Sequence, residues 1–97
     1  MASITAEELK ARICEILDYG SVILPGHVKK RMDERGYHMS DVRCILKNGD
    51  ITTFSNEGNE KYHCEIHGED LDGHKGAVIT IVTKNTKLVI LTVLGGL

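Results

Sequence analysis

The chain has 97 residues, of which 41% are hydrophobic and 27% charged, and its formal net charge is −2 at pH 7. This length predicts one domain over residues 1–97, with a single core that needs no cross-links. No apolar run approaches the roughly 20 residues of a membrane span, and the first residues lack a signal-peptide pattern. We therefore expect a cytoplasmic protein. The acidic balance excludes binding of nucleic acid through a global positive field, so any contact with RNA needs a local basic patch.

Cysteine usage fits the same compartment. Cys14, Cys44 and Cys64 are an odd set without a C-x-x-C pair, which argues against a disulfide framework and against a zinc ribbon. We expect three free thiols.

The first half of the chain predicts three helices. Residues 3–20 form the first, because Thr5 and Glu8 make a capping box and the apolar residues that follow fall on one face. An extended link over 21–24 leads to a second helix, which begins at Pro25 or Gly26 and stops at Gly36.

Apolar spacing fixes the buried sides of the later helices. Val28 and Met32 are the buried pair of the second helix. We expect Ser40 to cap a third helix, whose inward residues are Val42, Ile45 and Leu46 and which closes at residues 47–49 with K-N-G.

After Gly49 the pattern changes to strands. Residues 61–68 alternate, residues 76–83 and 87–93 are β-branched runs, and short turn-like segments connect them. Residues 50–55 add a further edge strand. The sequence therefore predicts an α+β fold, with N-terminal helices on one face of a three- to four-stranded antiparallel sheet.

Basic residues on the second helix are the first candidate site. With Val28 and Met32 inward, His27, Arg31 and Arg35 lie towards the other side, and His27 and Arg31 are one turn apart. A neutral histidine beside an arginine is a workable base and phosphate clamp for RNA cleavage. The alternative is an ordinary charged helix face that points to water.

The strand over residues 61–68 carries a second polar group. Alternation places Tyr62, Cys64 and Ile66 towards the core, and His63, Glu65 and His67 on the other face. This outer row has three interpretations: a polar sheet face, acid–base groups, or metal ligands. We rank the metal interpretation last.

The acidic segment G-E-D-L-D-G-H over residues 68–74 superficially suggests calcium. Its spacing fails the EF-hand pattern, and a hairpin turn built on Asp72 and Gly73 explains the residues better. We predict a turn here and no metal or other cofactor.

Two motifs carry a resemblance to a known group of proteins. The chain reads H-x3-R-M-x-x-R-G over residues 27–36 and Y-x5-G-x-D-x-D-G over residues 62–73. Over about residues 27–93, the chain resembles a family of small bacterial domains related to the MqsR-type toxins of toxin–antitoxin modules. Those toxins share the RelE-like microbial ribonuclease fold.

The resemblance implies an endoribonuclease that cleaves messenger RNA and is inhibited by a cognate antitoxin. The matching polar positions are His27, Arg31, Arg35 and Tyr62. Metal-independent cleavage needs a base, an acid and a cation on the phosphate. We expect His27 or His63 to act as base or acid, Arg31 and Arg35 to clamp the phosphate, and Tyr62 to orient the substrate. The alternative function is a non-catalytic protein-interaction module of the same fold.

Overall fold

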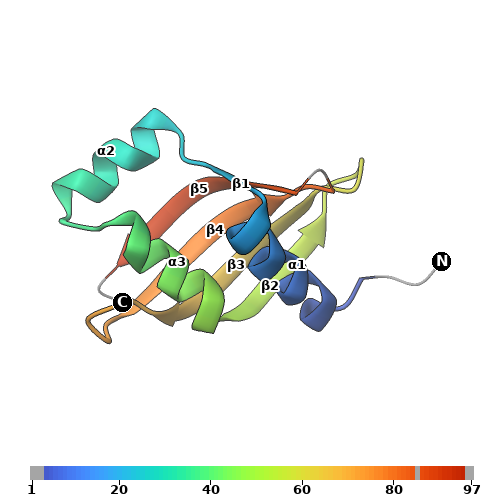
Figure 1. Cartoon of the computed structure of the whole chain (residues 1–97), viewed down its shortest axis with the longest axis horizontal. Coiled ribbons are helices and arrows are strands. Elements are labelled where there is room, and N and C mark those ends of the chain that lie inside the picture. The colour runs from blue at the N-terminus through green and yellow to red at the C-terminus, as the bar shows by residue number, and fades with distance from the viewer. Residues whose placement is uncertain (1–3, 85, 96–97) are drawn as a thin grey trace.

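A computed structural model describes residues 4–84 and 86–95. Over these residues the fold is α+β: three helices and one short strand come first in the chain, and four strands follow (Figure 1). In chain order the elements are α1 Ala6–Tyr19, β1 Ser21–Ile23, α2 Gly26–Glu34, α3 Met39–Asn48, β2 Asp50–Asn56, β3 Tyr62–Glu69, β4 Lys75–Val82 and β5 Lys87–Gly95.

The sheet differs from the predicted three- to four-stranded antiparallel sheet. It has five strands in the order β1-β5-β4-β3-β2, and β1 pairs parallel to β5 whereas the other pairs are antiparallel. Residues 21–24 were expected to be only an extended link. Residues 21–23 join the sheet because α1 ends at Gly20 directly against Thr86, whose carbonyl accepts the Ser21 N–H at 3.0 Å. Only glycine fits at position 20, since an added Cβ would lie 2.3 Å from that carbonyl oxygen.

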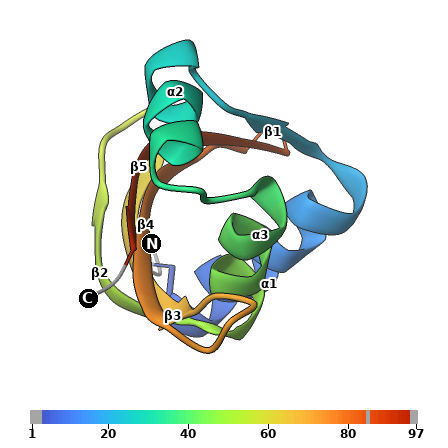
Figure 2. The ribbon, with the colours of Figure 1, turned by 90° about the vertical axis from the view of Figure 1, so that its left-hand side faces the viewer.

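The helices occupy two different places around the sheet. Figure 2 shows α1 and α3 covering one face, while α2 lies at the β5 edge. β1 pairs with only the first three residues of β5, and α2 packs against β5. The prediction that the helices cover one face therefore holds for α1 and α3, but not for α2.

One hydrophobic core lies between the sheet and the helices. The predicted inward residues of all three helices are buried in it, and Cys64 and Ile66 come from β3. The three cysteines are free thiols, as expected, and burial raises the pKa of Cys64 to about 12. No helix among the described residues is long and apolar enough to cross a membrane.

Candidate functional site

Three of the predicted site residues form a line along α2 and its C-cap residue, Arg35. His27, Arg31 and Arg35 follow one another at intervals of one helical turn, and all three are exposed. They border a small hollow of about 40 Å³ whose other wall is β5 residues 91–94. We call these three residues the basic row. It is about 12 Å long, from the rise of an α-helix over eight residues.

Arg35 joins the basic row to a larger cavity. Its Nη1 lies 3.5 Å from the Val93 carbonyl, to which it donates a hydrogen bond. The same residue borders a cavity of about 460 Å³, which we call the turn cavity; its other lining residues are Gly36, Tyr37, Asp41, Asp70, Asp72, His74 and Gly95. Arg35 therefore borders both hollows.

The wall of the turn cavity depends on a glycine pair in the sheet. Gly76 of β4 lies opposite Gly95 of β5, and the Tyr37 ring packs over both. A Cβ on Gly76 would lie 2.8 Å from the Tyr37 hydroxyl oxygen, and one on Gly95 would lie 2.9 Å from the ring. These distances are too short for any side chain, so the missing side chains make the space for Tyr37.

Tyr37 in turn holds the carboxylate of Asp70. The tyrosine hydroxyl donates to Asp70 Oδ2 at 2.9 Å, while Asp70 Oδ1 accepts the backbone N–H groups of Asp72 and His74 at 2.9 and 3.0 Å. Burial acts to raise the pKa of Asp70, but these hydrogen bonds outweigh it and leave the pKa below its usual value. Burial and the neighbouring carboxylate raise the pKa of Tyr37. Asp70 is therefore an ionised group in a fixed orientation, 6% exposed.

Asp41 connects the start of α3 to the turn between β3 and β4, which contains Asp70 and Leu71. Its Oδ2 accepts the His38 N–H at 3.0 Å, and its Oδ1 accepts the Leu71 N–H at 3.2 Å. The helix begins at Met39, with His38 at the N-cap position. The expected cap at Ser40 is therefore wrong, because that residue already lies inside the first turn.

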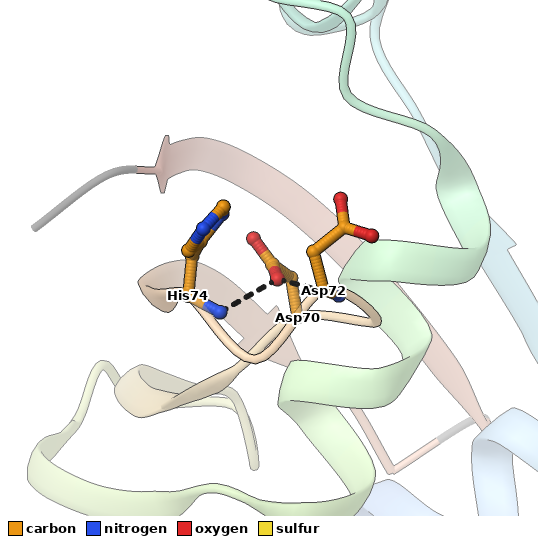
Figure 3. Close-up of side chains that lie close together, drawn as sticks. All are labelled: Asp70, Asp72 and His74. Carbon is orange, nitrogen blue, oxygen red and sulfur yellow. Dashed lines mark hydrogen bonds between the residues drawn. The ribbon is translucent and has the colours of Figure 1, made fainter.

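The turn between β3 and β4 brings three potential ligands together. The ligand atoms of Asp70, Asp72 and His74 lie within 4.8 Å of one another. Figure 3 shows the Asp70 carboxylate between the other two side chains, which stand on either side of it. The predicted turn is present at residues 71–73, and Gly73 has the positive φ (80°) that such a turn requires.

Tyr62 and His63 lie apart from the basic row. Tyr62 packs against the core on the helix-covered side, with the Arg12 guanidinium 5.9 Å from its ring centroid. His63 faces the uncovered side of the sheet, opposite Ser55 of β2 and Ile81 of β4. In β5 the residue paired with Ile81 is Val89, so His63 is aligned with Val89 across the sheet. The basic row instead faces residues 91–94 of β5. The structure thus brings together three of the five predicted site residues.

The outer row of β3 includes one close pair. His67 Nε2 and Glu65 Oε2 are 2.7 Å apart, on the uncovered face that alternation predicted. Among the described residues, however, the clustered potential ligands are in the turn after β3 and not in this row.

Sequence reasoning missed Tyr37 and His74 as members of a site. The acidic turn was visible in the sequence, but its meeting with Arg35 and Tyr37 depends on the glycine pair across β4 and β5. The available signal is a pair of glycines in the sequence. Gly76 begins the predicted strand over residues 76–83, and Gly95 follows the predicted strand over residues 87–93.

Comparison with known proteins places the chain in a family. A family model described as "Domain of unknown function (DUF4258)" matches residues 24–94. The chain belongs to the DUF4258 family. The DUF4258 match begins just before α2 and ends within β5, so it contains the basic row and most of the turn cavity, while α1 and β1 precede it. No curated protein and no solved structure matches the chain.

Proposed function

We propose that this DUF4258 protein is a toxin-like endoribonuclease that binds messenger RNA along the basic row and cleaves it by metal-independent acid–base chemistry. The observation that carries the proposal is the alignment of the exposed residues His27, Arg31 and Arg35 along α2 and its C-cap, beside a small hollow of about 40 Å³. The resemblance to MqsR-type toxins supports the same activity and adds a cognate antitoxin as the partner.

The chemistry follows from the order of the three side chains. His27 takes the proton of a ribose 2′-hydroxyl, and the freed oxygen forms a bond to the adjacent phosphorus. The bond from phosphorus to the 5′ oxygen breaks, that oxygen takes a proton from water, and a 2′,3′-cyclic phosphate remains. Arg31 neutralises the charge that develops on the reacting phosphate. Arg35, one turn farther, binds a neighbouring phosphate of the same strand.

His27 is exposed and lies in the first turn of α2, which begins at Gly26. Arg31 lies one turn away on the same side of the helix, so a phosphate bound by Arg31 is placed beside the imidazole. Tyr62 and His63 have no role in this reaction, because they lie at another part of the sheet.

The test is a comparison of matched variants of α2. We expect expression of the wild-type chain in a bacterium to arrest growth with fragmented messenger RNA. The purified His27→Ala/Arg31→Ala variant should cleave RNA at least about 100-fold more slowly, as expected for loss of a base and a charge-stabilising donor. The control is Lys29→Ala/Lys30→Ala, which removes two exposed positive charges from the same helix but none that borders either hollow.

Either of two results contradicts the proposal. One is a wild-type chain that leaves growth and RNA intact. The other is equal loss of activity in the lysine variant, which would mean that only the overall charge of α2 matters. Circular dichroism of each variant checks that it is folded.

A second function, a non-catalytic protein-interaction module, has its own supporting observation. The sheet face opposite α1 and α3 carries Ile79, Ile81 and Val89, all only partly buried, and none of the described helices lies over this face in Figure 2. Apolar side chains on an open face are typical of protein contacts. This function predicts no RNA cleavage by the wild type and no growth effect of the α2 variants.

A further inference from the structure

We propose that Asp70, Asp72 and His74 form a binding site for a divalent transition-metal ion, such as Zn²⁺, Mn²⁺ or Co²⁺, at the open side of the turn cavity. The inference does not depend on the ribonuclease proposal, because it concerns binding alone. It rests on the ligand set, on the fixed orientation of one ligand, and on the space beside the three side chains.

The ligand set matches a borderline metal. Two carboxylates and one imidazole supply oxygen and nitrogen donors, which suit Zn²⁺, Mn²⁺ and Co²⁺. Calcium takes six to eight oxygen ligands, and the imidazole reduces the oxygen donors of this turn to two side chains. The imidazole also distinguishes this group from an ordinary turn rich in carboxylates. The two carboxylates carry the charge that neutralises one divalent ion.

Asp70 is held in place before any ion binds. Its Oδ1 already accepts two backbone N–H groups, and its Oδ2 accepts the Tyr37 hydroxyl at 2.9 Å and no other donor among the described residues. A carboxylate oxygen has more than one lone pair, so Oδ2 keeps one for a metal. Metal-binding carboxylates are commonly oriented by such hydrogen bonds, which raise affinity. Tyr37 is therefore the residue that positions the central ligand.

The other two ligands have the freedom to close on an ion. Asp72 and His74 are exposed, and Figure 3 shows their side chains on opposite sides of the Asp70 carboxylate. Ligand atoms at about 2.1 Å from one ion lie no more than about 4.2 Å apart. The present separations of up to 4.8 Å therefore need only a small rotation of two exposed side chains.

The cavity leaves room for further ligands. The trio borders about 460 Å³ of open space, enough for several water molecules. Arg35 borders the same space, but its guanidinium is directed to the Val93 carbonyl. Asp41 also lines the cavity, so three carboxylates and one arginine border this space.

The experiment measures binding to the full chain after removal of metals with a chelator. Isothermal titration with ZnCl₂ and MnCl₂, together with the visible spectrum of added CoCl₂, should give one ion per chain. His74→Ala and Asp72→Asn should each weaken binding at least tenfold, and His74→Ala should also remove the nitrogen-ligand contribution from the cobalt spectrum. Tyr37→Phe, which keeps the ring but loses the hydroxyl, should weaken binding by about tenfold.

The control is His67→Ala, which removes a partly exposed histidine that pairs with Glu65 outside the trio. This variant should bind as the wild type does. The proposal is overturned if none of the three ions binds at millimolar concentration, or if His74→Ala and His67→Ala weaken binding equally. Because the readout is binding, a failure here leaves the ribonuclease test unaffected, and the reverse also holds.

Discussion

At the scale of single residues, Tyr37 connects the sheet to the acidic turn of the candidate site. Its ring fills the space over the Gly76–Gly95 pair, and its hydroxyl donates to the ionised carboxylate of Asp70. Deprotonation would place a phenolate beside that carboxylate, in a partly buried place. This is why the pKa of Tyr37 lies above its ordinary value near 10.

This arrangement predicts a loss of stability at high pH. A pKa that is higher in the folded than in the unfolded state stabilises the fold fully below about pH 10, and this contribution is lost as the pH rises above that value. In urea unfolding at pH 8, 10 and 11, the free energy of unfolding should therefore fall more steeply with pH for the wild type than for Tyr37→Phe. The two slopes should differ by less than the limit of about 1.4 kcal/mol per pH unit for one proton, because the ring is only partly buried.

Tyr19→Phe is the control for this measurement. Tyr19 is 88% exposed, so its removal should leave the wild-type slope unchanged. The buried thiol of Cys64 also has a raised pKa, but it contributes equally in all three proteins. Equal slopes for the wild type and Tyr37→Phe would contradict the proposed role of the hydroxyl.

At the scale of elements, the N-terminus of α3 and the β3–β4 turn are held by one side chain. Asp41 accepts one N–H from the residue before the helix and another from Leu71 in the turn. We expect Asp41→Ala to lower the free energy of unfolding by about 2 kcal/mol, since a cap and a second hydrogen bond are lost together. Ser40→Ala, the residue that sequence reasoning favoured as the cap, should change it by less than about 0.5 kcal/mol.

Chemical denaturation of the two variants decides between the caps. A larger loss in Ser40→Ala than in Asp41→Ala would contradict the observed hydrogen bonds.

The elements also show how far local sequence can be interpreted. The apolar spacing of each helix and the alternation along β3 depend on neighbours a few residues away, and both were predicted correctly. β1 could not be found in this way, because its three residues pair with residues 87–89, more than sixty positions later. The turn cavity was missed for the same reason: Arg35, Tyr37 and His74 meet only because the sheet brings Gly76 and Gly95 together.

At the scale of the whole molecule, the charge distribution limits how RNA can be bound. The chain has 14 acidic side chains against 12 lysines and arginines, so its overall field does not attract a polyanion. Binding through the proposed site depends on the two arginines of the basic row. Under the proposed function, the acidic groups that line the turn cavity with Arg35 should repel an RNA strand and restrict it to the α2 side.

The salt dependence of RNA binding tests this limit directly. Each phosphate neutralised on a single strand contributes about −0.7 to the slope of log affinity against log salt, so two arginines give about −1.4. Fluorescence anisotropy with a labelled single-stranded RNA whose 2′-hydroxyls are all O-methylated would measure binding without cleavage, because the attacking 2′-hydroxyl is blocked. Arg31→Ala/Arg35→Ala should bring the slope close to zero, while Lys29→Ala/Lys30→Ala should leave it unchanged. A slope steeper than about −3 would mean that RNA contacts basic residues across the surface. In that case the basic row would not be the binding site, whatever the net charge of the chain.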